Sequence, residues 1–424
     1  MSREKSFFSN IDWLIVFLYL ILLAIGWFNI YASGYDPSQN QSILDFNADS
    51  GKQLIWIGTS LVIIVTILIL DFRIYESVAP ILYVFFIILL IAVVIVGKET
   101  NGARAWFQFG SFRLQPSELT KFATALLLGR YVSTYGVKLT TFKNQMICFA
   151  IMLFPVALIM IQPDLGSALI FFSFILPIFR EGLPPIYLIT GLSVVIIGTL
   201  SIILPPQTMA IILASVGVVW VLLTSKSVKN ILLTLVIVAA GFGFSSGFIY
   251  IFDNALPEYQ RDRIMIIFYP DMFSEQGAGY NLNQSKIAIG SGGFAGKGFL
   301  DGTQTKFDFV PAQSTDFIFS TLAEEHGWLG SAFVIALFIT LLMRITFIAE
   351  RQKSTFARFY GYSVASILFF HFTINIAMTV GLFPVVGIPL PFVSYGGSSL
   401  WSFTIMLFVL LKIDMHRAQV LMRS

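Results

Sequence analysis

The chain has 424 residues, of which 57% are hydrophobic and 12% are charged, and its mean hydropathy is +0.83. A soluble globular domain carries about 25% charged residues, so this composition excludes that class and indicates a polytopic membrane protein. The net charge of +3 gives no reason to expect a nucleic-acid partner. The single cysteine, Cys148, excludes a disulfide framework, and three histidines far apart in the sequence weaken any zinc site.

Apolar runs near the ~20 residues needed to cross a bilayer predict about twelve transmembrane helices. They fall near residues 11–33, 53–71, 78–97, 117–134, 143–161, 165–180, 186–204, 208–224, 229–252, 328–348, 359–382 and 396–415. We therefore predict an all-α polytopic membrane protein, with residues 1–424 forming a single integral membrane domain. The first run has no small-residue cleavage motif, so we interpret it as a retained anchor.

Lysine and arginine residues are concentrated in alternate short loops, as the positive-inside rule requires for cytoplasmic segments. This distribution predicts that both termini are cytoplasmic. It also places a long polar loop, residues 253–327 between spans 9 and 10, outside the cytoplasm. Among polytopic proteins, a loop of this length is more often functional than a passive connection.

Eight glycines lie between residues 277 and 302 of this loop, and they allow the backbone to approach a ligand closely. Charged residues are interleaved with them and continue beyond them, namely Lys286, Lys297, Lys306, Asp301, Asp308 and Asp316. We predict that the loop carries the chemistry and that the membrane helices hold it in place.

A second polar segment precedes the fourth span. Pro116 begins a helix, and Glu118 and Lys121 are three residues apart, so both lie on one helix face just inside the membrane. One interpretation is interfacial, with Arg104 and Arg113 at lipid headgroups, Trp106 in the aromatic belt and a local ion pair. The other is a cationic, aromatic-lined cleft for a phosphorylated ligand.

Asp164 lies between two apolar runs, where a charged group is costly unless it faces a partner or water. The neighbouring Pro163 and Gly166 indicate a tight turn, so Asp164 either faces a polar cavity or caps the sixth helix. Residues 383–399 contain three prolines and three glycines, so they form a re-entrant turn rather than a continuous helix. Asn375, just before this turn, is expected to hydrogen-bond to a neighbouring helix.

Asp316 lies at the end of the long loop. By spacing, Thr315 or Asp316 can cap a helix that runs towards the tenth span, and Thr321 with Glu324 also fits a capping box. A capping carboxylate has a lowered pKa, so service as a general base would require desolvation against Phe317 and its neighbours.

Six stretches in this order resemble the SEDS family (shape, elongation, division and sporulation proteins): NGARAWF…PSELTK, QPDLGSA, YQRDRI, GAGYNLNQSKIAIGSGG, STDFIFSTLAEE and PVVGIPLPFVSYGGSS. They span roughly residues 100–400, and the last of them resembles the elongation members. That family has ten spans, so the resemblance implies that residues 186–224 are an inserted helical hairpin.

The resemblance implies a peptidoglycan glycosyltransferase that polymerises lipid II at the outer face of the cytoplasmic membrane during elongation and cell-shape maintenance, releasing undecaprenyl diphosphate. It implies Asp316 as the catalytic carboxylate. It also implies a cavity lined by further residues, namely Arg104, Trp106, Glu118, Lys121 and Asp164. Charge and glycine context, rather than the resemblance, add Lys286 and Lys297 as substrate-binding residues.

No cofactor is assigned, and a divalent cation, magnesium or manganese, is one option. The chain contains no transpeptidase domain, so the resemblance implies a class B penicillin-binding protein as partner, together with other proteins of the elongation complex. Two alternatives stay open: a lipid II flippase with Asp164, Glu118 and Lys121 along its path, and a non-catalytic scaffold.

Overall fold

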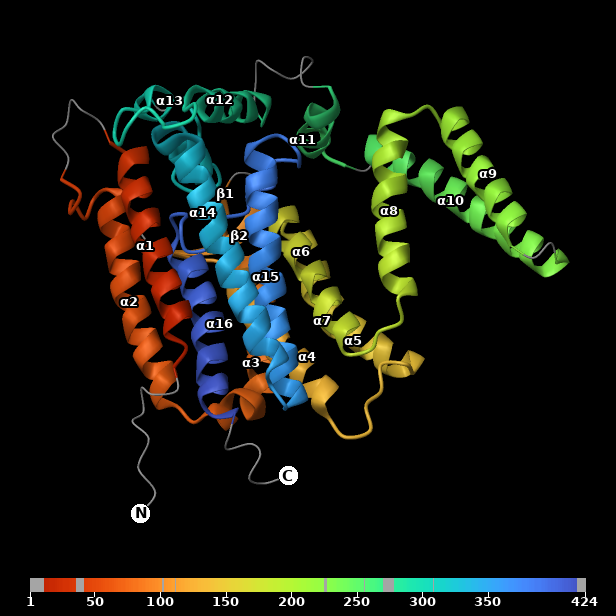
Figure 1. Cartoon of the computed structure of the whole chain (residues 1–424), viewed down its shortest axis with the longest axis horizontal. Helices are drawn as coiled ribbons and strands as arrows, with labels where there is room; N and C mark the ends of the chain where they lie inside the picture. The colour runs from red at the N-terminus through yellow and green to blue at the C-terminus, as the bar shows by residue number, and fades with distance from the viewer. Residues whose placement is uncertain are drawn as a thin grey trace. The chain divides into compact units, whose positions relative to one another are not determined.

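The structure is a computed structural model, and it describes residues 11–35, 42–100, 103–110, 112–224, 227–254, 256–269, 278–307 and 309–417. The chain divides into two compact units, one made of Met1–Leu183 and Tyr280–Ser424 and the other of Pro184–Gly279. Each unit is built almost entirely of helices (Figure 1).

The larger unit contains most of the helices and all three strands. Its helices are α1 (Trp13–Ser33), α2 (Asp49–Ile69), α3 (Phe72–Val96), α4 (Pro116–Ser133), α5 (Phe142–Ile161), α6 (Leu165–Phe171), α7 (Ile175–Arg180), α12 (Ala278–Ser291), α13 (Thr303–Lys306), α14 (Ile318–Glu350), α15 (Thr355–Thr379) and α16 (Gly397–Met415). A short 3-10 turn, Phe172–Phe174, joins α6 to α7.

The core of this unit lies where α4, α15 and α16 pack together, with α2 and α3 against them. In the most apolar stretch of α16, 89% of the residues are buried, whereas the corresponding value for α2 is 17%. Several polar side chains in the core are paired internally; for example, the buried Tyr360 hydroxyl donates to the carbonyl of Met406, 3.0 Å away. Such pairing is required where water is excluded.

All twelve predicted spans coincide with helices, and among the described residues ten of these helices are long and apolar enough to cross a membrane. The protein is therefore an all-α, multi-pass membrane protein, as predicted. The two segments that fall short are α4 and the α6–α7 stretch. Helix α4 carries Glu118, Lys121 and Arg130, and it is accommodated because other helices surround it.

A small antiparallel sheet connects α3 to α4, and the sequence analysis did not anticipate it. It consists of β1 (Lys98–Thr100), β2 (Ala103–Phe109) and β3 (Phe112–Leu114), in the order β1-β2-β3. Lys98 pairs with Trp106, and Gln108 pairs with Arg113. β3 lies against α16, so the sheet joins the end of the larger unit at which α16 begins.

The two ends of the larger unit contain different helix ends and different polar residues. Asp12, at the start of α1, and Asp414, near the end of α16, both pair with Arg351 at the end of α14. The start of α14, the end of α15 and the start of α16 lie at the opposite end, together with Asp316 (Figure 1). About 30 Å of helix separates Thr355 from Asn375, which places the two ends a membrane thickness apart.

The glycine-rich stretch before α13 crosses α14 with direct backbone contact. The amides of Lys297 and Gly298 donate to the carbonyls of Glu324 and Glu325, at 3.1 and 3.0 Å. At the crossing, α14 is interrupted by Gly327, whose φ is 62°. A methyl group on Gly327 would collide with the backbone of Gly296, so this crossing requires glycine.

The smaller unit consists of α8 (Ile186–Ile203), α9 (Pro206–Leu223), α10 (Val228–Asn254) and α11 (Glu258–Phe268). The predicted hairpin over residues 186–224 corresponds to α8 and α9, and α10 packs against both of them. Only 11% of the most apolar stretch of each of these three helices is buried. Their remaining apolar surface is what lipid would cover.

Candidate functional site

Glu118 and Lys121 form the predicted ion pair on α4. Lys121 is completely buried, and its Nζ lies 2.8 Å from Glu118 Oε1 and 2.7 Å from Nε2 of His371 on α15. The ammonium group also lies 5.6 Å from the centre of the Phe403 ring. Glu118 Oε2 is buried with no partner among the described residues.

The contact with Lys121 fixes the tautomer of His371. An ammonium group can only donate, so His371 Nε2 accepts and Nδ1 carries the ring proton. Nδ1 then donates to the carbonyl of Pro389, 3.2 Å away in the re-entrant turn. The sequence analysis did not single out His371, because an isolated histidine in an apolar run carries no spacing signal.

Asp164 caps α6, which confirms the structural alternative for this residue. Its Oδ1 accepts the backbone amide of Ser167 at 3.0 Å. Its Oδ2 accepts from the Gln115 side chain at 2.8 Å, at the start of α4. Asp164 therefore also joins α6 to the helix that carries the Glu118–Lys121 pair.

The expectation that Thr315 or Asp316 caps a helix is wrong. Helix α14 begins at Ile318, and the position before it is Phe317, which makes no side-chain cap. The preceding residues instead form turns closed on the Ala312 carbonyl, which accepts from the amides of Thr315 and Phe317. The helix therefore begins too late for either side chain to cap it.

The expected capping box of Thr321 with Glu324 is also wrong, because both residues lie inside α14. Glu324 is completely buried and accepts from the backbone amides of Gln304 and Thr305, at 2.9 and 3.0 Å. It also pairs with Lys297, whose Nζ is 2.7 Å from Glu324 Oε1. Glu324 thus holds the loop before α14 instead of capping the helix.

The backbone around Asp316 is tied to the re-entrant turn and to α15. The Asn375 side-chain amide donates to the carbonyls of Asp316, at 2.9 Å, and Ile388, at 2.7 Å. The Ser394 hydroxyl donates to the carbonyl of Thr315 at 2.6 Å. The expectation that Asn375 hydrogen-bonds to a neighbouring helix is therefore wrong; its partners in the described part of the chain are the backbone carbonyls of the Asp316 loop and of the re-entrant turn.

The Asp316 carboxylate lies over the backbone of Gly387 in the re-entrant turn. A methyl group on Gly387 would sit 3.4 Å from Asp316 Oδ2. Asp316 itself is partly exposed, while the next residue, Phe317, is 1% exposed. The carboxylate is therefore presented from a fixed backbone at a partly exposed position, an arrangement that suits a proton acceptor.

The small sheet carries two cationic side chains, and one of them, Arg113, lies near the re-entrant turn. Arg104 on β2 is exposed and Trp106 is partly buried. Arg113 on β3 lies near Tyr395, next to the Ser394 that holds the Asp316 loop. The pKa of Tyr395 is raised, mainly by burial and also by the Asp49 carboxylate. A hydrogen bond with Trp56 and the charge of Arg113 offset part of this increase. Tyr395 was not predicted as a site candidate, and Arg113 was named in the sequence only as a residue at lipid headgroups.

The two loop lysines lie in different settings. Lys286 on α12 is exposed, and its stem reaches Gly381 at the end of α15, near the Asp316 loop. Lys297 is held in the ion pair with Glu324 and also donates to Thr303 Oγ1 at 2.8 Å. The structure thus links Glu118, Lys121 and Asp164 through α4, and it leaves Lys297 in a separate cluster.

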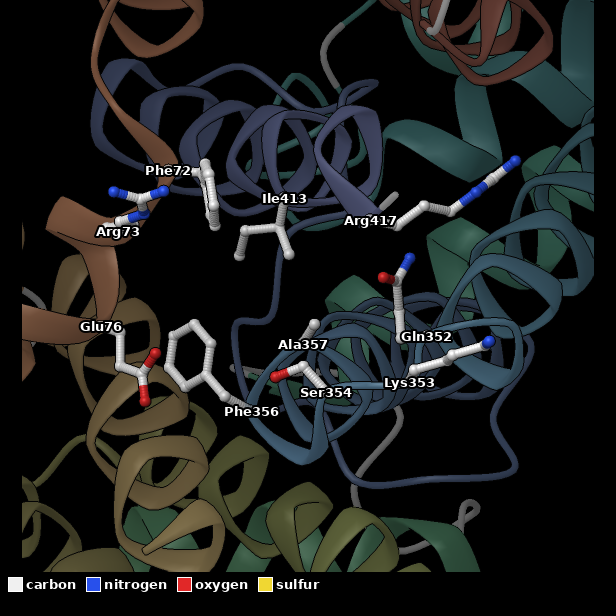
Figure 2. A pocket seen from close by; sticks show the side chains of 10 residues that line it. All are labelled: Phe72, Arg73, Glu76, Gln352, Lys353, Ser354, Phe356, Ala357, Ile413 and Arg417. Carbon is white, nitrogen blue, oxygen red and sulfur yellow. The ribbon is translucent and has the colours of Figure 1, made fainter. Parts of the chain in front are cut away.

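A cavity of about 220 Å³ lies at the opposite end of the larger unit and contains none of the predicted site residues. Figure 2 shows apolar side chains around its opening, while the charged ends of Lys353 and Arg417 extend to one side. Among the residues that the structure describes, no group of three or more His, Cys, Asp and Glu side chains could hold a metal ion.

Comparison with known proteins identifies the family. The model of the FtsW/RodA/SpoVE cell cycle proteins matches residues 12–204 and 184–419. The chain belongs to this family. It is the family that the six sequence motifs predicted.

Curated FtsW/RodA/SpoVE relatives match along most of this chain. The peptidoglycan glycosyltransferase MrdB of Escherichia coli is 36% identical over 85% of this chain and 84% of its own length. The peptidoglycan glycosyltransferase RodA of Treponema pallidum is 32% identical over 96% of this chain and 98% of its own length.

Solved structures agree with the family assignment. A chain from a peptidoglycan synthase complex, described as coordinating polymerization and crosslinking, has a TM-score of 0.72 and 25% identity, covering 97% of this chain and all of that one. The rod shape determining protein RodA of Thermus thermophilus has a TM-score of 0.63 at 24% identity, covering 97% and 98% of the two chains, which supports the fold alone.

Proposed function

We propose that this protein is a peptidoglycan glycosyltransferase that polymerises lipid II into glycan strands during cell elongation. The observation that carries the proposal is the 36% identity, over most of both chains, to a relative named peptidoglycan glycosyltransferase MrdB. The geometry adds a carboxylate, Asp316, whose backbone is held from two sides. Cationic residues are present in the same end of the larger unit.

In the proposed reaction, Asp316 acts as the general base. A sugar hydroxyl of one substrate attacks the anomeric carbon of the other, and its proton passes to the Asp316 carboxylate. The new glycosidic bond forms as the bond from carbon to the pyrophosphate oxygen breaks, and undecaprenyl diphosphate leaves with the electron pair. One base is enough for a single displacement, which inverts the anomeric centre.

Negative charge that develops on the departing pyrophosphate requires nearby cations. Arg104 and Lys286 are exposed cations that could make this contact with the substrate, and Arg113 lies near Tyr395, next to the Ser394 that holds the Asp316 loop. A magnesium or manganese ion would fit as a companion of the pyrophosphate, because magnesium is often bound by one or two carboxylates together with substrate phosphates. Asp316 would be a carboxylate able to contribute, and Asp49 also reaches the same loop, where it accepts from the Ser314 hydroxyl at 3.4 Å.

We place the Asp316 end at the outer face of the cytoplasmic membrane. The start of α1 and the end of α16 lie at the other end of the larger unit. The short loops rich in lysine and arginine assign that end to the cytoplasm. For crosslinking, we propose a class B penicillin-binding protein as partner; purified complexes that never contain such a protein would contradict this.

The function is tested by incubating labelled lipid II with the purified protein and its partner and separating the products by length. The wild type should form polymer, and Asp316→Asn, which preserves size, should form at least about 100-fold less, as expected when a general base is lost. Equal polymer formation by both proteins would exclude Asp316 as the base. A folded wild type without activity, in the presence of its partner, would favour the transporter alternative.

A further inference from the structure

Two side chains on one face of α15 hold consecutive carbonyls of the re-entrant turn. Asn375 donates to Ile388 and His371 donates to Pro389, at 2.7 and 3.2 Å. The two residues are four apart, so they lie one helical turn from each other on the same face. Both are at most 1% exposed, so water does not replace these bonds.

Asn375 also connects the turn to the Asp316 loop. Its Nδ2 has two hydrogens, and each has a separate carbonyl, one from Asp316 and one from Ile388. A single side-chain amide therefore fixes the distance between the loop that presents the carboxylate and the Gly387–Ile388 backbone over which the carboxylate lies. The carboxylate and this backbone lie close together, since a methyl group on Gly387 would be 3.4 Å from Asp316 Oδ2.

Lys121 and Glu118 hold His371, the second α15 residue that donates to the re-entrant turn. The Lys121 ammonium donates to His371 Nε2, and this contact leaves the ring proton on Nδ1, the nitrogen that faces Pro389. Glu118 in turn holds Lys121 at 2.8 Å. Lys121 is fully buried and has two partners, so contact between Lys121 and the pyrophosphate of the substrate would first require breaking this arrangement.

We propose that Glu118, Lys121, His371 and Asn375 form a polar spine that positions the Asp316 carboxylate through the backbone of the re-entrant turn. These four are positioning residues rather than groups that touch the substrate. The inference rests on the proposed function of Asp316. A displacement of about 1 Å in a reacting group can cost about 100-fold in rate, so hydrogen bonds of this kind control turnover.

A pair of substitutions at His371 separates its two contacts. In His371→Asn, the amide nitrogen lies near the place of Nδ1 and can still donate to Pro389, while the contact with Lys121 is lost. In His371→Gln, the amide reaches the place of Nε2 and retains Lys121, while Pro389 loses its donor. Both variants bury one unmatched polar group, so they provide matched controls for stability.

Lys121 acts in the spine by keeping the ring proton of His371 on Nδ1, which an asparagine amide does not need, so His371→Asn should keep kcat within about threefold of the wild type. His371→Gln and Asn375→Leu should lower kcat about 100-fold at saturating lipid II. KM should change much less than kcat, because no substrate contact is removed. Tyr360→Phe is the structural control, since it loses a buried hydrogen bond between α15 and α16 far from Asp316. It should lower Tm and leave kcat unchanged.

Equal kcat in the two His371 variants, or full turnover by folded Asn375→Leu, would overturn the positioning role. If Asn375→Leu does not fold, the comparison of the His371 variants still decides. Asp316→Asn, run in parallel, separates this result from failure of the proposed function. An inactive Asp316→Asn beside fully active spine variants rejects the spine alone, whereas an active Asp316→Asn rejects the role of Asp316 on which the spine depends.

Discussion

The two ends of the larger unit use polar residues in different ways. At the Asp316 end, neutral side chains of Asn375, His371 and Ser394 donate to backbone carbonyls. At the other end, charged side chains pair with one another: Arg344 lies 2.8 Å from Asp12, and Arg351 pairs with both Asp12 and Asp414. The first arrangement fixes backbone positions, and the second joins the ends of helices.

Because of this difference, substitutions at the two ends can separate effects on activity from effects on stability. A carbonyl held by one amide moves when that amide is removed, and the residue that the carbonyl belongs to moves with it. An ion pair between helix ends contributes to the free energy of unfolding, and the active end, about 30 Å away, has no direct part in it. Substitutions at the two ends should therefore have distinct signatures.

The largest loss of stability is expected for Glu324→Gln, which changes a charged residue that holds backbone at the Asp316 end. It removes the charge that pairs with Lys297 and accepts from two amides, and breaking such a buried pair costs about 3–5 kcal/mol. Chemical unfolding in mild detergent measures this loss. Wild-type stability in this variant would show that neutral hydrogen bonds suffice at the Asp316 end.

Asp414→Asn tests the opposite end. Asp414 binds Arg351, Gln352 and Arg417, and hydrogen bonds to charged groups contribute about 1.5–3 kcal/mol, so the free energy of unfolding should fall by about 2 kcal/mol. Polymer formation by the folded protein should not change. A loss of turnover comparable to that of Asn375→Leu would mean that the two ends are coupled, contrary to the comparison.

Gly387→Ala sharpens the comparison at the Asp316 end. Gly387 has a φ of 70°, a conformation that costs a residue with a side chain about 1–2 kcal/mol. The added methyl group would also contact Asp316 Oδ2. We expect a modest decrease in Tm with a decrease in kcat of about tenfold, which corresponds to about 1.4 kcal/mol. Unchanged kcat with lowered Tm would indicate that the carboxylate tolerates movement.

The smallest effect is expected for Arg180→Gln. Arg180 pairs with Glu350 and both side chains are about half exposed, so solvent screens the attraction. Neither Tm nor polymer formation should change measurably, and added salt should make no difference between variant and wild type. A clear decrease in Tm would show that surface pairs matter as much as Asp414 does.

Much of the fold was predictable, because apolar runs of membrane length fix helices almost independently of their neighbours. The Glu118–Lys121 pair was predictable because it depends only on helical spacing within α4. The three-strand connection was not predicted, because strands of three and seven residues leave little periodicity to detect.

The candidate site was only partly predictable. The motif around Asp316 identified the residue, but spacing suggested a helix cap where the structure has a turn closed on Ala312. His371, Arg113 and Tyr395 depend on contacts between segments far apart in the sequence, which no local pattern reports. Asn375 was noticed because it is polar within an apolar run, and its partners became visible only in three dimensions.

The backbone crossing at Gly296 and Gly327 has a consequence for large-scale mutagenesis. Almost any side chain at Gly327 would push the loop away from α14, so a saturation library should lose nearly all variants there. Ranked by fitness alone, the position would resemble a reactive group. Intolerance to substitution in this region can therefore reflect close contact between two backbone segments as well as a role in the reaction. Only activity measured per folded molecule distinguishes these two causes.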